Sequence, residues 1–169
     1  MQDVTIIGAG PAGLTAGLYA ARAGLNTLIL AGAELGGQLL LTEKIENFPG
    51  FPTASGLDLI ETIRAQAESA GAKLIREQAI KVDLSHKPFF VQTESKLYET
   101  QTLILATGAK ARWLKIPSEE KFKGRGVSIC ATCDGFFYRG KRVAVIGGGS
   151  SAVYEALLLM TLAREVIIV

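Results

Sequence analysis

Two cysteines and an aspartate stand close together in the segment SICATCDGFF. Cys130 and Cys133 are separated by two residues, and Asp134 follows directly. A CxxC pair of this kind can bind a metal, form a structural staple or exchange electrons as a redox dithiol. The spacing alone leaves all three chemistries open, so the rest of the sequence has to decide among them.

A metal site is disfavoured by the number of available ligands. Structural zinc needs four, usually two cysteine pairs or one pair with histidines, and His86 is the only histidine. We therefore expect no metal. Two buried, unreactive cysteines remain an alternative. A redox pair needs a stabilised thiolate and a proton carrier nearby. Asp134 could carry the proton, but its charge opposes the thiolate, so a positive group or an electron-poor ring would have to stabilise it.

A glycine-rich turn lies near the start of the chain, in the segment IIGAGPAGL. It follows a β-branched run typical of a strand and precedes an alanine- and leucine-rich segment typical of a helix. In this pattern Gly8 permits the tight turn, Gly10 lets the backbone approach a pyrophosphate, and Gly13 lets the helix pack on the strand. An ordinary strand-to-helix turn is the alternative, but the complete βαβ context favours a nucleotide site.

The same pattern recurs later in the chain, in the segment VAVIGGGSSAV. Gly147, Gly149 and Ala152 form a GxGxxA motif in which Gly147 lies 139 positions after Gly8. An internal repeat of the βαβ unit predicts two nucleotide sites. Dithiol and nucleotide folds together suggest electron transfer from a nicotinamide through a flavin to the disulfide.

The residue that binds ribose in such folds lies about 20 positions after the glycine motif. For the first loop this falls near Ala31, which is not acidic. We therefore expect the first site not to be a standard NAD pocket. For the second loop the corresponding position falls just past Val169.

The segments between the two repeats complete an α/β pattern. Residues 53–75 predict an amphipathic helix that ends at Gly71. Residues 73–108 contain short apolar runs joined by turns, which we interpret as an antiparallel meander that leads into a buried strand. The polar residues 110–126 are the expected linker, with the domain boundary at Ile116. This division predicts domains 1–116 and 117–169, the second being incomplete.

Composition and charge exclude several classes of protein. The chain has 169 residues, is 49% hydrophobic and has a formal net charge of +2. These values are typical of a soluble globular chain and give no reason to expect nucleic acid or an anionic membrane as partner. Apolar runs are too short to span a membrane, and two cysteines are too few for a disulfide framework. We therefore expect a cytoplasmic protein.

Together these motifs closely resemble the low-molecular-weight, bacterial-type thioredoxin reductases. The resemblance covers essentially the whole chain, and CATCDGFFYRG between two glycine loops is its most specific part. The larger reductase class differs because its cysteines lie in the first domain, where this chain has GGQL. The resemblance implies an FAD/NAD(P)-binding Rossmann-like fold (three-layer ββα), electron transfer from NADPH through FAD to thioredoxin, and a homodimer in the full-length form.

The resemblance also implies roles for individual residues. Cys133 would face the flavin, Cys130 would attack the thioredoxin disulfide, and Asp134 would serve as general acid and base. The first domain would contact FAD through Gly8, Gly10, Pro11, Ala12, Gly13, Gly37, Gln38, Asn47, Ala106, Thr107 and Gly108. The second loop would contact NADPH through Gly147, Gly149, Ser150, Ser151 and Ala152.

Two departures from the family pattern affect the NADPH half. Ser150 stands where the family usually has Asp or Asn, and Tyr154 stands where it has the first of two Glu residues. Family members also continue past Val169, so we expect a fragment or a truncated reading frame that does not turn over alone. The alternatives are a reductase of another disulfide partner, such as a peroxiredoxin-type protein, a non-catalytic flavin-binding remnant, and a ferredoxin-type or NADPH-independent reductase.

Overall fold

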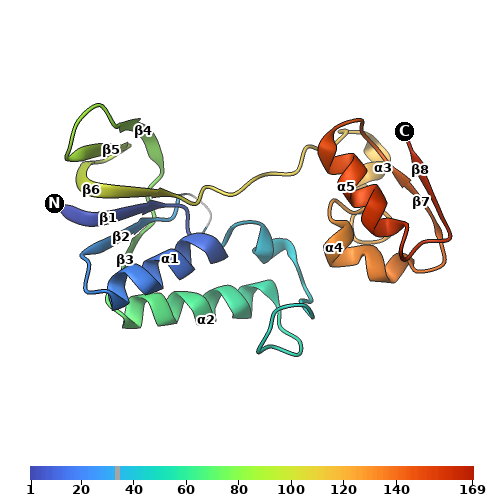
Figure 1. Ribbon diagram of the computed structural model, residues 1–169, viewed down its shortest axis with the longest axis horizontal. Helices are drawn as coiled ribbons and strands as arrows, with labels where there is room; N and C mark the ends of the chain where they lie inside the picture. Colours follow the sequence, from blue (N-terminus) through green and yellow to red (C-terminus); the bar gives the residue numbers. More distant parts are fainter. Residues whose placement is uncertain (33–34) are drawn as a thin grey trace. The chain divides into compact units, whose positions relative to one another are not determined.

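The computed structural model describes residues 1–32 and 35–169. These residues form two compact units, Met1–Lys110 and Ala111–Val169, and each unit is described by itself (Figure 1). The predicted boundary, Ile116, lies inside the second unit, immediately before helix α3 (Pro117–Phe122). Within 1–32 and 35–169, no helix has the length and apolar character needed to cross a membrane.

Unit 1 is built on a six-stranded sheet with the order β3-β2-β1-β6-β5-β4. Strands β1, β2, β3 and β6 are parallel where they pair, whereas β4, β5 and β6 form an antiparallel meander. The long strand β6 belongs to both parts, because its first half pairs with β5 and its second half with β1. The strands are β1 (Gln2–Ile7), β2 (Thr27–Leu30), β3 (Lys73–Ile75), β4 (Ala79–Asp83), β5 (Phe89–Thr93) and β6 (Leu97–Leu105).

Helices cover one face of the parallel strands, and the meander covers the other. Figure 1 shows α1 (Pro11–Arg22) and α2 (Gly56–Ser69) side by side along the sheet. The core on the helix side includes Ile6, Leu14, Ile29, Leu59 and Ile60. On the other face Leu28 and Leu30 pack with Val91 and Tyr98 of the meander. The predicted α/β fold of the FAD/NAD(P)-binding, three-layer Rossmann-like class is confirmed.

Local signals set the ends of α2 as the sequence predicts. The Ser55 hydroxyl accepts a hydrogen bond from the Asp58 N–H and caps the first turn. Gly71, with a φ of 105°, follows the last turn. One prediction for the next segment is wrong: residues 73–75 do not join the antiparallel meander. They form β3, which pairs parallel with β2, because a helix connecting neighbouring strands returns the chain in the same direction.

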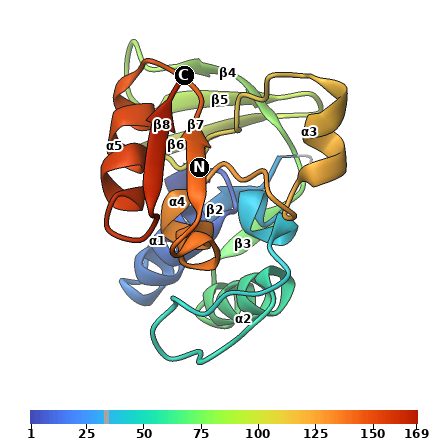
Figure 2. The same ribbon diagram turned by 90° about the vertical axis from the view of Figure 1, so that its right-hand side faces the viewer.

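Unit 2 contains a short two-stranded parallel sheet, β7 (Arg142–Val145) and β8 (Glu165–Ile168), linked by α5 (Ser150–Leu159). Figure 2 shows α5 next to the two strands. Before the sheet come α3, α4 (Ala131–Asp134) and the 3-10 turn η2 (Gly135–Tyr138). The polar segment predicted as a linker therefore contains helix α3, which begins at Pro117 because proline is favoured in a first helical turn.

The two units repeat the same backbone pairing. Val4 pairs with Thr27 and Val143 pairs with Val166, so both pairings join residues 23 positions apart. The turn after the first strand repeats as well. The Gly8 N–H donates to the Leu30 carbonyl at 2.8 Å, and the Gly147 N–H donates to the Val169 carbonyl at 2.8 Å. The internal repeat predicted from the sequence is therefore present in the structure.

Candidate functional site

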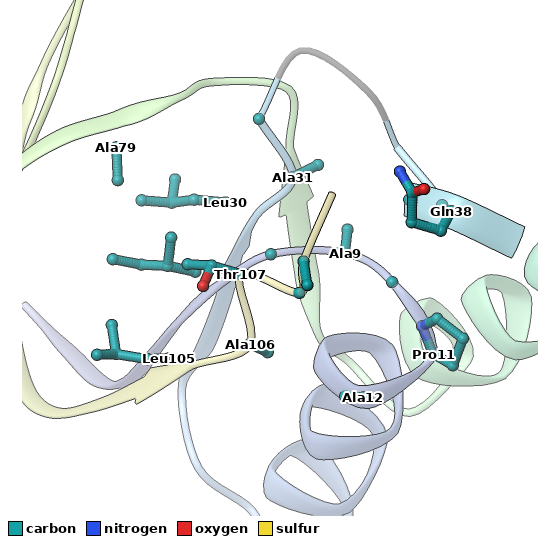
Figure 3. Close-up of a pocket in the computed structure, with 18 of the residues that line it drawn as sticks. Ala9, Pro11, Ala12, Leu30, Ala31, Gln38, Ala79, Leu105, Ala106 and Thr107 are labelled. Carbon is teal, nitrogen blue, oxygen red and sulfur yellow. The ribbon is translucent and has the colours of Figure 1, made fainter. Parts of the chain in front are cut away.

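The first glycine loop opens onto a groove of about 780 Å³ in unit 1. The groove lies at the carboxyl ends of β1, β2 and β6, where nucleotides bind in open α/β sheets. Figure 3 shows Ala9, Pro11 and Ala12 following one another into α1, with Ala106 and Thr107 beside the turn. The predicted FAD-binding residues that line it are Gly8, Gly10, Pro11, Ala12, Gly37, Gln38, Ala106, Thr107 and Gly108.

Backbone packing explains why two positions of this loop are glycine. Gly8 has a φ of 111°, and a Cβ there would lie 2.1 Å from the carbonyl oxygen of Ala106. A Cβ on Gly13 would lie 1.9 Å from the carbonyl oxygen of Gly8. Both distances are far below contact, so only glycine fits. Gly10 differs, because its Cβ would meet nothing closer than 3.9 Å and its φ of −76° is ordinary.

The first turn of α1 is prepared for an anion. Gly10 is the N-cap, Pro11 occupies the start of the helix, and the turn contains no acidic residue and no capping side chain from the described part of the chain. Backbone N–H groups at such a helix start bind phosphate because they are unpaired and carry the positive end of the helix dipole. The loop and groove therefore fit the pyrophosphate of a dinucleotide.

Two of the predicted FAD-binding residues do not line the groove. Gly13 is buried beneath the turn, and Asn47 lies in an exposed stretch that does not line the groove. Ala31 lines the groove after β2, whereas the acidic residue that follows it, Glu34, is outside the described residues. Sequence reasoning missed Lys110, a cationic residue that also lines the groove. Its position shortly after Gly108 in the segment that follows β6 was the signal for it.

A hydrogen-bonded carboxylate joins the wall of the groove to the meander. Glu77 Oε2 accepts from the Thr93 hydroxyl at 2.6 Å and from the Tyr98 hydroxyl at 3.1 Å. The Glu77 carbonyl accepts the N–H of Gly32, a groove residue, at 3.0 Å. Hydrogen bonds from Thr93 and then Ser95 hold the pKa of Glu77 below its ordinary value. Burial, together with the bond to Glu77, raises the pKa of Tyr98.

In unit 2 the two cysteines form a disulfide. Cys130 and Cys133 are joined with their Cα atoms 5.3 Å apart, at the start of the four-residue helix α4. The Cys133 N–H donates to the Cys130 sulfur at 3.1 Å, so Cys130 caps this turn. Cys130 is half-buried and Cys133 is exposed in unit 2.

Within residues 1–32 and 35–169, no group of three or more potential metal ligands is assembled.

Asp134 is held beside the disulfide by Ser128. The Ser128 hydroxyl donates to the Asp134 carboxylate and accepts the Cys130 N–H at 3.1 Å. The Asp134 N–H donates to the Cys130 carbonyl at 3.0 Å. A carboxylate and one cysteine are thus linked through a single hydroxyl. Sequence reasoning missed Ser128, although a hydroxyl two residues before a turn-capping residue is a common source of local hydrogen bonds.

A second support for the cysteine turn comes from α5. Glu155 Oε2 accepts the N–H of Ala131, between the two cysteines, at 2.6 Å. Gly135 is buried against the same region, since a Cβ there would lie 3.2 Å from a methyl of Leu162 and 3.4 Å from one of Leu159. The Glu155 contact was also missed. It joins residues 24 positions apart, and nothing in the local sequence indicates it.

The second glycine loop has the same course but looser packing. Gly147 has a φ of 131°, and a Cβ there would lie 3.6 Å from the Cβ of Ala152. Gly149 has no atom within 4 Å of a Cβ and forms the N-cap of α5. Ser150 and Ser151 start the helix, which has no side-chain cap from the described residues. The turn suits a phosphate, but it does not line the recess of unit 2, whose lining residues end at Ile146 and resume at Glu155.

The fold and the sites define a protein that combines dinucleotide-binding βαβ units with a disulfide in a CxxC turn. The sequence family described as pyridine nucleotide-disulphide oxidoreductase matches residues 2–169. The chain belongs to this family.

Curated relatives are similar over nearly the whole chain. Thioredoxin reductase from Rickettsia bellii is 53% identical and covers 98% of this chain, and that from Escherichia coli O157:H7 is 51% identical with the same coverage. The solved structure of thioredoxin reductase from Giardia duodenalis has a TM-score of 0.92 at 42% identity and covers 99% of this chain. The chain spans about half of each: 54%, 52% and 55% of their lengths.

Proposed function

We propose that the chain is the N-terminal half of a thioredoxin-disulfide reductase. In this proposal electrons pass from NADPH through FAD and the Cys130–Cys133 pair to thioredoxin. The observation that carries the proposal is the disulfide itself, held in a capped turn next to Asp134 in a chain with two glycine loops. Binding of NADPH, thioredoxin as partner, a cytoplasmic location and a homodimeric full-length form are proposed from the resemblance and the relatives.

FAD is proposed to bind in the groove of unit 1. The turn at Gly8, Gly10, Pro11 and Ala12 and the start of α1 would hold its pyrophosphate. Gly37, Gln38, Ala106, Thr107 and Gly108 line the same groove and would contact the rest of the molecule, with Asn47 beyond it. When bound, FAD supplies transfer of electron pairs between a nicotinamide and a disulfide. The second loop at Gly147, Gly149, Ser150, Ser151 and Ala152 would take the phosphates of NADPH.

The cysteine turn indicates how the dithiol would act. Once two electrons and two protons have converted the disulfide to two thiols, the Cys133 N–H is placed to stabilise a negative charge on the Cys130 sulfur. The Cys130 thiolate would attack one sulfur of the partner disulfide and release the other as a thiolate. Cys133 would then attack Cys130, which reforms the internal disulfide and frees the reduced partner. Asp134 would hold and return the proton near these sulfurs.

Trapping of the mixed disulfide tests this assignment. In the Cys133→Ser variant the second step is blocked, so the chain is expected to accumulate a covalent complex with oxidised thioredoxin that dithiothreitol releases. The matched Cys130→Ser variant keeps a free thiol on the exposed position and is expected to give little complex. Equal trapping by both variants would contradict the assignment of Cys130. No trapping by either, with both variants folded, would contradict thioredoxin reduction by this pair.

A further inference from the structure

Glu155 makes the contact that ties α5 to the cysteine turn. Its carboxylate accepts the Ala131 N–H at 2.6 Å, and Ala131 lies between the two cysteines of the disulfide. Glu155 is half-buried, as is Ala131, and it shares the inward side of α5 with the buried residues Ala156 and Leu159. A negative charge is therefore held against the backbone of the redox turn by a helix from another part of unit 2.

This charge opposes the charge that forms on reduction. Reduction of the disulfide yields a sulfur that becomes a thiolate to react, and Cys130 is bonded to the residue that Glu155 contacts. The carboxylate and a thiolate carry like charges, which repel each other. The oxidised form carries no charge on sulfur and does not feel this repulsion. A carboxylate at this position therefore favours the disulfide over a reduced pair that carries a thiolate.

We propose that Glu155 is a positioning residue that sets the redox equilibrium of the Cys130–Cys133 pair and makes its dithiol a stronger reductant. The hydrogen bond to Ala131 fixes where the carboxylate lies, and the carboxylate charge acts on the sulfur. The inference rests on the proposed function only in treating the pair as redox-active. It requires no FAD, NADPH or thioredoxin.

Equilibration of the 169-residue chain with glutathione measures the effect. Two glutathione thiols are oxidised to one glutathione disulfide, the bond between Cys130 and Cys133 breaks, and each protein sulfur gains a proton or remains a thiolate. The Glu155→Gln variant keeps an oxygen that can accept the Ala131 N–H but removes the charge. At about pH 9, where thiols ionise, we expect its equilibrium constant to move about three- to tenfold toward the reduced pair, a potential about 15 to 30 mV more positive. Alkylation of the thiols followed by a gel shift gives the ratio.

Two further variants separate charge from structure. Glu155→Ala removes both the charge and the hydrogen bond, and Glu120→Gln removes an exposed charge from α3 of the same unit. The proposal expects Glu155→Gln to shift the equilibrium, an effect that shrinks at high salt, and Glu120→Gln to match the original chain. It is overturned if Glu155→Gln also matches the original chain, whether or not Glu155→Ala differs. Failure to trap thioredoxin would refute the proposed function and leave this measurement intact.

Discussion

The two glycine loops follow the same backbone course but differ in how tightly they are packed. In unit 1 a Cβ on Gly8 or Gly13 would fall about 2 Å from a carbonyl oxygen, at 2.1 and 1.9 Å. In unit 2 the position equivalent to Gly13 is Ala152, and the nearest contact of a Cβ on Gly147 is 3.6 Å. The third position of the motif therefore holds a methyl group in unit 2 and excludes one in unit 1.

The neighbouring strands account for the difference at the first glycine of the motif. In unit 1 β1 lies between β2 and β6, and the chain leaving β6 places Ala106 directly across Gly8. In unit 2 β7 pairs with β8 alone among the described strands. The crowding at Gly8 therefore comes from the chain that leaves a third strand, β6, whereas the crowding at Gly13 comes from the carbonyl of Gly8 within the turn itself. The groove of unit 1 is built by that third strand as well.

The largest expected effect comes from exchanging glycine and alanine at the third position of the motif, which is Gly13 in unit 1 and Ala152 in unit 2. Gly13→Ala places a methyl group against the Gly8 carbonyl, and we expect it to lower the free energy of unfolding of unit 1 by at least about 3 kcal/mol. Ala152→Gly removes a methyl group from α5 and should cost only about 1 kcal/mol. Urea titration followed by circular dichroism measures both. Trp113, the single tryptophan, lies in unit 2 and reports that unit separately. Equal costs at the two positions would refute the comparison.

The middle glycines of the two motifs, Gly10 and Gly149, test ligand binding, because a methyl group at either position would not clash with the protein. Gly10→Ala has room for its methyl group, so its free energy of unfolding should change by no more than about 0.5 kcal/mol. The methyl group would keep a pyrophosphate from the backbone, and we expect FAD affinity to fall about tenfold or more, about 1.4 kcal/mol. Flavin fluorescence titration measures it. Gly149→Ala is the matched control and should leave FAD binding unchanged. An unchanged FAD affinity for Gly10→Ala would argue against the groove as the flavin site.

Acid sensitivity should distinguish unit 1 through Glu77. Because the pKa of Glu77 in the folded chain is lowered from 4.5, the folded state binds fewer protons than the unfolded state near that pH. Its contribution to stability is therefore complete above pH 4.5 and is lost as the pH falls through the lowered value. Glu77→Gln should be less stable than the original chain at neutral pH, and the difference should shrink in acid. Urea titrations at several pH values measure this.

The control for acid sensitivity is Glu94→Gln, an exposed carboxylate in the same meander. It should leave the pH dependence nearly unchanged. A difference between Glu77→Gln and the original chain that stays constant with pH would mean that the lowered pKa does not contribute to stability.

The smallest expected effect on the free energy of unfolding concerns the polar residues at the starts of the paired strands in each unit. In unit 1 the Asp3 carboxylate accepts the Asn26 N–H at 2.8 Å, whereas at the equivalent positions of unit 2 Arg142 pairs with Glu165. The latter pair is exposed, so Glu165→Gln should cost about 0.5 kcal/mol or less, and this cost should vanish in high salt. Trp113 fluorescence during urea titration measures it. A cost above about 1 kcal/mol would show that this pair helps to hold the sheet of unit 2 together.

Much of the fold was predictable because it depends on local signals. The glycine loops, the Ser55 cap and the strand patterns act over a few residues, and the repeat that relates Gly8 to Gly147 is visible in the sequence alone. The error at residues 73–75 has a different origin. Three residues of strand have the same pattern in a parallel or an antiparallel sheet, and only the crossover from β2 through α2 decides which neighbour they pair with.

The sequence by itself determined which chemistry the chain carries: a CxxC pair followed by an aspartate, and two turns suited to phosphate. Residue type and spacing decide these properties, because a sulfur, a carboxylate or a missing Cβ has the same chemistry in any fold. Tertiary structure alone decided what surrounds them. The Ala106 carbonyl lies against Gly8, the Thr93 hydroxyl donates to the Glu77 carboxylate, and the Glu155 carboxylate accepts the Ala131 N–H. These contacts join distant segments, so they exist only after the sheet and helices have packed.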